Sequence, residues 1–140
     1  MADFLNIRVL DCWIHEQDMR RAVDKPGHLG GPAAEHTVDR LLRTIPIVVG
    51  KRAATPEGGA VIIDITGDVT RRVVCEVNGG RAAIVETAAR EPQATVVLDS
   101  EAFIILATGR RTAVMIGERI GLSGDEILAS KVVGNLNMMI

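Results

Sequence analysis

The sequence predicts an α+β fold, in which one long N-terminal helix precedes an antiparallel sheet of about five strands with helices on one face. Apolar positions in residues 3–23 recur at helical spacing. Asn78-Gly79-Gly80 separates two strand-like runs, and Asn and Gly tolerate the positive φ angles that a tight hairpin requires. The patterns follow the order helix, helix, four strands, helix, strand, helix, which is typical of helices layered on an antiparallel sheet.

The N-terminal helix, residues 3–23, ends before Lys25-Pro26-Gly27. Its first half is apolar around most of its circumference, and such a helix requires neighbours on several sides. The apolar residues are Phe4, Leu5, Ile7, Val9, Leu10, Cys12, Trp13 and Ile14. We therefore expect a homodimer or higher homo-oligomer with this helix at its centre and Trp13 largely buried, because two-fold dimers are the commonest oligomers.

The other elements follow from turn and cap residues. Residues 26–32 form a flexible connection, which divides the chain into residues 1–25 and residues 33–140. We expect a helix over 33–52 with a break near Ile45, followed by strands over 60–66, 69–77, 81–86 and 94–98. A helix capped by Asp99 or Ser100 and closed by Gly109 comes next. A short strand around Ile120 then leads to a last helix, which is opened by a capping box from Ser123 to Glu126.

Composition excludes several classes of function. Hydrophobic residues make up 47% of the 140 residues and aromatic residues only 2%, so the core is expected to be aliphatic. A formal charge of −2 and the scattering of the arginine pairs argue against nucleic-acid binding, which requires a clustered basic surface. We expect no membrane span and no signal peptide. Two cysteines make no disulfide framework, and a reduced cytoplasmic setting is expected.

The most informative stretch for chemistry runs from Asp11 to Arg21, DCWIHEQDMRR. Asp11 and His15 are four residues apart, so a helix places them on one face, where a carboxylate and an imidazole are able to share a divalent cation. The alternative is an acid–histidine pair that only hydrogen-bonds a neighbour. Cys12 and Cys75 are interpreted as packing residues, and His28 and His36 as surface residues.

Three segments carry a resemblance to a known family. The first is Phe4-Leu5-x-x-Arg8 with Asp11-x-Trp13-x-His15-Glu16-Gln17-Asp18-x-Arg20. The second consists of Pro26-Gly27-His28, Ala33-Ala34-Glu35-His36 and Ile45-Pro46-x-Val48-Val49-Gly50-Lys51-Arg52-Ala53. The third runs from Gly124-Asp125-Glu126 to Asn135-x-Asn137-x-Met139-Ile140. Together they resemble the mycothiol-dependent maleylpyruvate isomerase family. That family joins a DinB-like metal-binding helical bundle to a C-terminal domain similar to sterol carrier proteins. On this resemblance, residues 1–25 are the last bundle helix and residues 33–140 the sterol-carrier-like domain.

The resemblance implies a divalent metal, most often zinc, that activates the thiol of mycothiol toward an unsaturated acid. It assigns Asp11 and His15 as two metal ligands, whereas the third, a histidine from an earlier helix, is not in this sequence. Family members often carry Glu at the position of Asp11. The resemblance also implies an arginine that contacts the substrate anion, and the candidates are Arg110, Arg111 and Arg119. For Arg110 and Arg111 the alternative is that they only place positive charge at the C-terminal end of a helix. With two of three ligands, the metal site of this chain is incomplete.

Two other functions remain open. The chain is a candidate for a small binding module, in which an apolar tunnel between sheet and helices holds a lipid. Its candidate lining residues are Phe103, Ile104, Met115, Met138 and Met139. The third interpretation is a structural remnant of a truncated enzyme that dimerises through its first helix.

Overall fold

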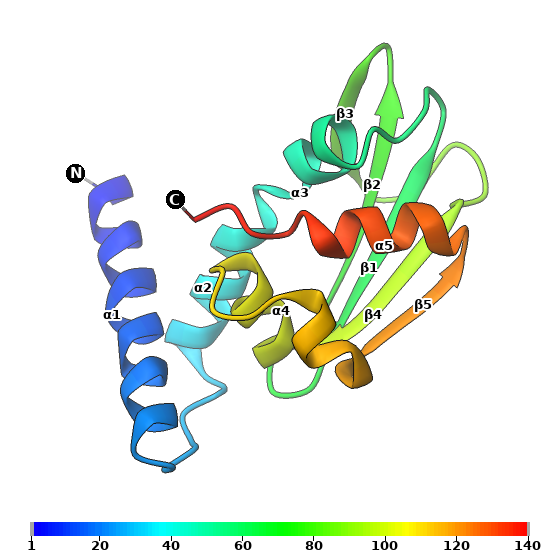
Figure 1. Cartoon of the computed structure of the whole chain (residues 1–140). Helices are drawn as coiled ribbons and strands as arrows, with labels where there is room; N and C mark the ends of the chain where they lie inside the picture. The colour runs from blue at the N-terminus through cyan, green and yellow to red at the C-terminus, as the bar shows by residue number, and fades with distance from the viewer. Residues whose placement is uncertain (1, 140) are drawn as a thin grey trace.

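The computed structural model describes residues 2–139 and contains one five-stranded sheet in the order β3-β2-β1-β4-β5. The strands are β1 (Ala60–Thr66), β2 (Arg71–Asn78), β3 (Arg81–Val85), β4 (Ala94–Asp99) and β5 (Ile120–Gly124). The helices are α1 (Ala2–Ala22), α2 (Pro32–Leu42), α3 (Ile45–Ile47), α4 (Ser100–Ala107) and α5 (Glu126–Gly134), with a π-helical turn η1 (Val48–Arg52) and a 3₁₀ segment η2 (Ala113–Arg119). The predicted α+β fold, with a long N-terminal helix and helices on one face of the sheet, is confirmed (Figure 1).

The sheet is mostly antiparallel, with one parallel pair at its centre. β1 pairs antiparallel with β2, β2 with β3 and β4 with β5, whereas β1 and β4 run parallel. The parallel pair arises because the chain crosses from β3, at one edge, to the far side of β1. The segment that connects β3 to β4 is attached to β2 by a hydrogen bond, which the Ala89 N–H donates to the Glu76 carboxylate at 2.6 Å. A parallel pair requires such a crossover, which short strand signals in a sequence do not reveal.

The predicted hairpin joins β2 and β3. Gly79 and Gly80 have φ angles of 61° and 73°, which is the left-handed region that a two-residue turn requires. Asn78 and Arg81 pair across the turn. Glu57 accepts hydrogen bonds from the N–H groups of Gly79 and Gly80 at 2.6 and 2.9 Å. The second strand begins at Arg71 rather than at the expected Val69, which lies buried in the preceding turn.

The core lies between the sheet and the helices. Alternate side chains of the central strands point into it, and they are Val61, Ile63, Ile65, Cys75, Val96 and Leu98, each at most 2% exposed. From the other side α4 contributes Phe103, which is fully buried. Asp99 caps α4 by accepting from the Ala102 N–H at 2.9 Å, as expected, and Gly109 follows the helix with a φ of 69°.

The capping box predicted at Ser123 is wrong. Ser123 lies within β5, where it pairs with Thr95. Asp125 is the N-cap of α5, and its carboxylate accepts from the Leu128 N–H at 3.0 Å. In a capping box the Ser is the N-cap residue, directly before the first residue of the helix. Pairing with β4 keeps Ser123 extended, so the next acceptor along the chain caps the helix.

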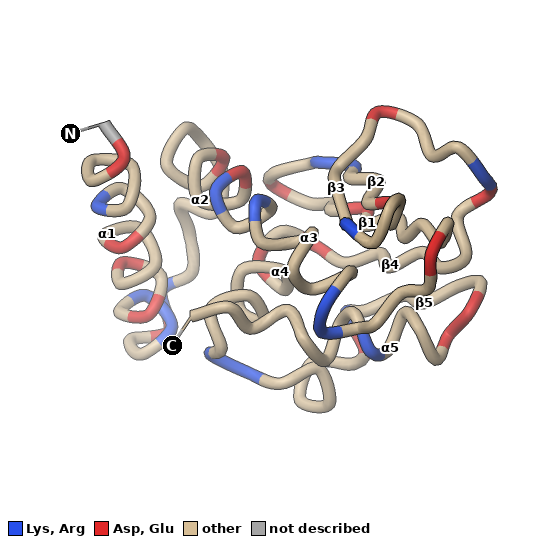
Figure 2. The backbone as a smooth tube through the Cα atoms, turned by 90° about the horizontal axis from the view of Figure 1, so that it is seen from above, with Lys and Arg blue, Asp and Glu red and all other residues tan. Residues whose placement is uncertain are grey.

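The first helix lies at the outer edge of the molecule, with α2 between it and the sheet (Figures 1 and 2). Only one stripe of α1 is buried, formed by Leu10, Trp13, Ile14 and Gln17. The break expected near Ile45 occurs at Arg43 and Thr44, between α2 and α3. Among the helices of residues 2–139, none is both long enough and apolar enough to cross a membrane.

Candidate functional site: an apolar groove beside the first helix

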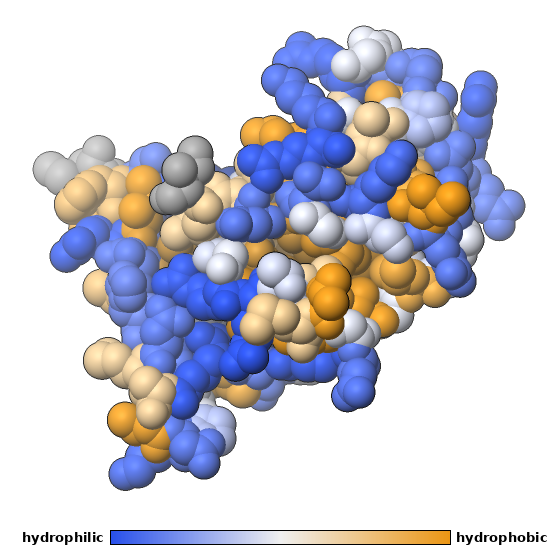
Figure 3. Space-filling view, in the orientation of Figure 1, coloured by the Kyte–Doolittle hydropathy of each residue, from blue (hydrophilic) through white to orange (hydrophobic). Residues whose placement is uncertain are grey.

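A groove of about 370 Å³ runs between α1, α2 and the C-terminal tail, residues 135–139. It is lined by Ile7, Leu10, Asp11, Arg40, Leu41, Arg43, Thr44, Met138 and Met139. We call it the α1–tail groove. Figure 3 shows apolar surface over the N-terminal end of α1, next to this groove. A groove lined by five apolar residues, with a few polar groups at its rim, has the composition of a small-molecule site.

The tail wall of the groove is fixed by the core behind it. Leu136 is 1% exposed and anchors the tail. The Met138 N–H donates to the carbonyl of Ala107, at the end of α4, at 3.1 Å. Arg52 donates to the carbonyl of Asn137 at 2.6 Å. These contacts hold the backbone of Met138, while its flexible thioether side chain is free to adapt to an occupant.

The opposite wall is fixed by the contact of α1 with α2 and the loop between them. His36 contacts the carbonyl oxygen of Asn6 through Nε2 at 3.1 Å. The buried Gln17 side chain donates to the carbonyls of Gly27 and His28 at 3.2 Å each, and the Trp13 indole N–H donates to the carbonyl of His28 at 3.1 Å. Trp13 is 3% exposed, so its predicted burial is achieved within one chain.

Two arginines give the rim of the groove positive charge. Arg40 donates to Asp3 at 2.9 Å, and this hydrogen bond holds the pKa of Asp3 below its ordinary value. Within residues 2–139, the guanidinium of Arg43 makes no hydrogen bond or ion pair. Arg43 is therefore the cation at this rim that is available to an anionic group from outside.

The two proposed metal ligands lie at the solvent-exposed edge of the same groove, where Asp11 belongs to its lining and His15 points further into solvent. His15 Nε2 is 3.3 Å from Asp11 Oδ1, and its other ring nitrogen is 3.7 Å from Asp18 Oδ2. The His15 and Asp11 side chains are 63% and 45% exposed. Among the described residues, no group of three or more His, Cys, Asp and Glu side chains is arranged to hold a metal ion. Two ligands do not fit a zinc site, which takes three or four protein ligands.

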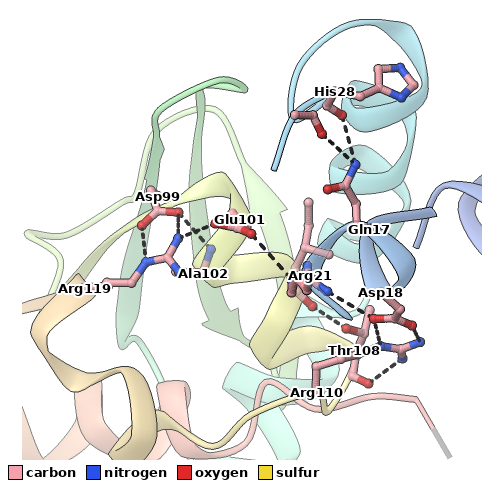
Figure 4. A network of polar contacts seen from close by, with 12 residues as sticks. Gln17, Asp18, Arg21, His28, Asp99, Glu101, Ala102, Thr108, Arg110 and Arg119 are labelled. Carbon is pink, nitrogen blue, oxygen red and sulfur yellow. Dashed lines mark hydrogen bonds and ion pairs between the residues drawn. The ribbon is translucent and has the colours of Figure 1, made fainter. Parts of the chain in front are cut away.

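The candidate anion-binding arginines occupy three different environments, and Figure 4 shows those of Arg110 and Arg119. Arg110 donates to Asp18 at 2.8 Å. Arg119 donates to Asp99 at 2.9 Å and to Glu101 at 3.1 Å, and Asp99 raises the pKa of Arg119 further above its ordinary value. An external carboxylate has to displace these partners before it binds either guanidinium.

Arg111 is the exception among the three, because within residues 2–139 no carboxylate pairs with it. It lines a second hollow of about 350 Å³ between α4, η2 and α5, together with Leu106, Val133 and Asn137. The structure thus separates the three arginines and does not bring them to Asp11 and His15, except that Arg110 reaches α1 through Asp18.

The five residues proposed to line a tunnel also separate. Phe103 and Ile104 are at most 2% exposed and fill the core, whereas Met115 is 62% exposed on η2. Met138 and Met139 line the α1–tail groove instead. Sequence reasoning missed Arg40, Leu41 and Thr44 as groove residues, although all three lie just before the break that it predicted near Ile45.

The interpretation of both cysteines as packing residues is half right. Cys75 is fully buried in β2, and burial raises its pKa to about 11. Cys12 is exposed, so its interpretation as a packing residue is wrong. α1 buries only the stripe that faces α2, and Cys12 lies on the other side of the helix. His28 is on the surface as expected, with Nδ1 at 2.9 Å from the Glu16 carboxylate.

The arrangement of strands and helices matches solved structures. The apo sterol carrier protein 2 of Yarrowia lipolytica superposes with a TM-score of 0.52 at 10% identity, over 73% of this chain and 88% of that chain. The palmitated sterol carrier protein 2-like 2 of Aedes aegypti gives 0.52 at 22% identity, over 73% and 96%. The UbiJ-SCP2 ubiquinone synthesis protein gives 0.50 at 11% identity, over 75% and 96%.

This chain has the fold of sterol carrier protein 2. At these identities the likeness concerns the fold alone. No family model and no curated protein matches the sequence. The sterol-carrier-like part of the sequence resemblance is therefore confirmed at the level of fold, and the comparisons give no support to the maleylpyruvate isomerase part.

Proposed function

We propose that this chain is a binding module for small amphiphiles with an apolar chain and an anionic head. The observation that carries the proposal is the α1–tail groove. Its apolar lining is formed by Ile7, Leu10, Leu41, Met138 and Met139, and beside it lies Arg43, whose guanidinium has no partner among residues 2–139. Its volume of about 370 Å³ falls within the range of small-ligand sites, roughly 300–1,000 Å³.

Each part of the groove has a role in this function. The aliphatic and thioether side chains remove the ligand's apolar chain from water. Met138 and Met139 adapt to chains of different shape, because the unbranched thioether has several accessible rotamers. Arg43 binds the anionic head with its guanidinium fork. Asp11, on the opposite wall, disfavours a second negative charge deeper in the groove.

The fold supports the proposal by analogy. The Aedes aegypti protein of the same fold is described as palmitated, which makes a fatty acid the natural first probe. The core between sheet and helices is filled by side chains such as Phe103 and Ile63, which are not exposed at all. We therefore place the ligand at the edge of α1 and not in a central tunnel.

A titration with palmitate and with hexadecanol, monitored by displacement of a fluorescent fatty acid, tests the proposal. We expect Arg43→Ala to weaken palmitate binding roughly tenfold, about 1.4 kcal/mol, and to leave hexadecanol binding unchanged. We expect Met139→Asp to weaken both ligands. Arg81→Ala, an exposed arginine on β3 away from the groove, is the matched control.

Two outcomes count against this site. Absence of binding of either probe up to millimolar concentration rejects the function. Binding that is insensitive to Arg43→Ala and Met139→Asp but lost in Arg111→Ala moves the site to the hollow between α4, η2 and α5, where Arg111 lies beside Leu106 and Val133.

The thiol-dependent isomerase activity implied by the sequence resemblance stays a prediction. Asp11 and His15 supply two of the ligands that such a metal requires. We derive no catalytic step from this pair. Calorimetry with zinc at neutral pH tests it, and submicromolar binding that is lost in His15→Ala would indicate that a second chain completes the site.

A further inference from the structure

The face of α1 that points away from the rest of the molecule carries a heptad repeat. Its members alternate at spacings of four and three residues, and they are Leu5, Val9, Cys12, Glu16, Met19 and Val23. We call this set the α1 seam. Alternating spacings of three and four are the pattern by which two helices pack along their whole length.

The α1 seam is distinct from both the buried stripe and the groove. At about 100° per residue, its centre lies about 130° around the helix from the stripe that packs on α2. Leu5, Val9 and Met19 are 57%, 41% and 64% exposed. Val23 continues the helix, because its N–H donates to the carbonyl of Met19 at 3.1 Å, and it is 63% exposed. In Figure 2 no other helix or strand lies on this side of α1, and the loop after α1 reaches the seam only where His28 contacts Glu16.

We propose that the α1 seam binds the α1 seam of a second copy of this chain in antiparallel orientation. A heptad face is complementary to itself, as a two-fold interface requires. In the antiparallel register that uses the whole seam, Leu5 lies opposite the partner's Val23 and Val9 opposite the partner's Met19.

The charge of Glu16 decides the orientation. A parallel dimer places the two Glu16 side chains in one layer, where like charges repel each other. The antiparallel register places Glu16 opposite the partner's Cys12. In its own chain Glu16 is held by Arg20 at 2.8 Å and by His28 at 2.9 Å, so its carboxylate remains satisfied at the rim of the seam.

The size of the seam sets the strength of the dimer. A helix of 21 residues is about 32 Å long, and a contact strip about 10 Å wide covers roughly 300 Å² per chain. The total of about 600 Å² lies well below the roughly 1,200–2,000 Å² of stable interfaces and is in the range of weak, transient contacts. We therefore expect a dimer that dissociates on dilution through the micromolar range and not a permanent assembly.

Sedimentation velocity from about 5 to about 500 μM tests self-association by mass action. We expect the mean mass to rise from that of the 15.0 kDa monomer toward twice that value. Val9→Glu should abolish the rise. Ile127→Glu is the matched control, because Ile127 is 73% exposed on α5, away from the seam. Circular dichroism and the emission of the buried Trp13 establish that each variant folds.

Disulfide trapping tests the orientation. In a Cys12→Ser background, the double change Val9→Cys/Met19→Cys places two cysteine pairs in register across an antiparallel dimer, and oxidation should yield a covalent dimer. Val9→Cys alone should not, because the two copies of residue 9 then lie about ten residues, or about 15 Å, apart along the axis.

A monomer throughout the concentration range overturns the proposal, as does association that Val9→Glu leaves intact. A covalent dimer through Val9→Cys alone indicates the parallel arrangement and overturns the proposed orientation. Failure of ligand binding at the α1–tail groove does not affect these measurements, since the groove lies on the opposite side of α1.

Discussion

Arg110 donates two hydrogen bonds to Asp18, from Nη2 to Oδ2 at 2.8 Å and from Nε to Oδ1 at 3.3 Å. The contact joins the turn after α4 to α1, two segments 92 residues apart in the chain. It also lowers the pKa of Asp18 from its ordinary value, chiefly through the hydrogen bond from Arg110. The arginine suggested as a substrate contact thus has a structural partner in the folded chain.

We expect Arg110→Ala to lower the free energy of unfolding by about 1 kcal/mol at neutral pH, the upper range for a partly exposed ion pair. The folded-state pKa of Asp18 is depressed, so its contribution is present above the ordinary value of 3.8 and is lost as the pH falls through the lowered value. Urea unfolding at pH 7 and at about pH 2.5 should show the difference between variant and wild type shrink. Arg111→Ala, with no carboxylate partner among residues 2–139, is the control, and an equal loss in it would contradict the assignment.

The cap of α5 gives a second prediction. Asp125→Ala should cost about 0.5–2 kcal/mol of stability, because its carboxylate accepts the Leu128 N–H. Ser123→Ala should cost less than about 0.5 kcal/mol, because Ser123 is exposed in β5 and makes no cap. Chemical denaturation of both variants measures these losses. A larger loss of stability in Ser123→Ala than in Asp125→Ala would favour the capping box at Ser123 after all.

The two thiols should differ in reactivity. Cys12 is exposed, whereas Cys75 is buried with a pKa raised to about 11. At about pH 8, an aromatic disulfide reagent should therefore modify one thiol per folded chain, and both thiols in denaturant. Cys12→Ser should leave the folded chain unreactive. Rapid modification of Cys75 in that variant would mean that the core opens far more readily than its packing indicates.

Gln17 should stabilise the position of α1. Its buried amide donates to the carbonyls of Gly27 and His28, and removing it leaves the carbonyl of Gly27 without that donor. We expect Gln17→Leu to cost about 1–3 kcal/mol and to shift the emission of Trp13 to longer wavelength. Arg8→Ala, an exposed change on the same helix, should alter stability by less than about 0.5 kcal/mol. Equal effects in the two variants would show that the Gln17 hydrogen bonds contribute nothing.

Local signals predicted most of the fold because they act within a few residues. Asn78-Gly79-Gly80 specified the hairpin, since only a few residue types adopt its positive φ angles. Asp99-Ser100 indicated the start of α4, and in the structure Asp99 is the residue whose carboxylate accepts the capping hydrogen bond. The cap at Ser123 was misassigned because pairing of β5 with β4, a long-range contact, holds that residue extended.

The site was less predictable because it is assembled from three distant segments. Met138 and Met139 meet Leu41 and Ile7 only after the tail returns to α4 and α1 packs on α2. No spacing in the sequence relates positions so far apart. The ion pair of Arg110 could not be predicted for the same reason, because its partner Asp18 lies on another helix.

By itself, the sequence determined the α+β class, the order of the elements, the hairpin and the apolar character of α1, all of which follow from backbone preferences and periodic patterns of hydrophobicity. Only the tertiary structure decided that β1 and β4 run parallel, that α1 buries one stripe and exposes the α1 seam, and that Arg43 lines the α1–tail groove. These features depend on which distant surfaces come into contact, and that is settled by packing of the whole core and not by any local preference.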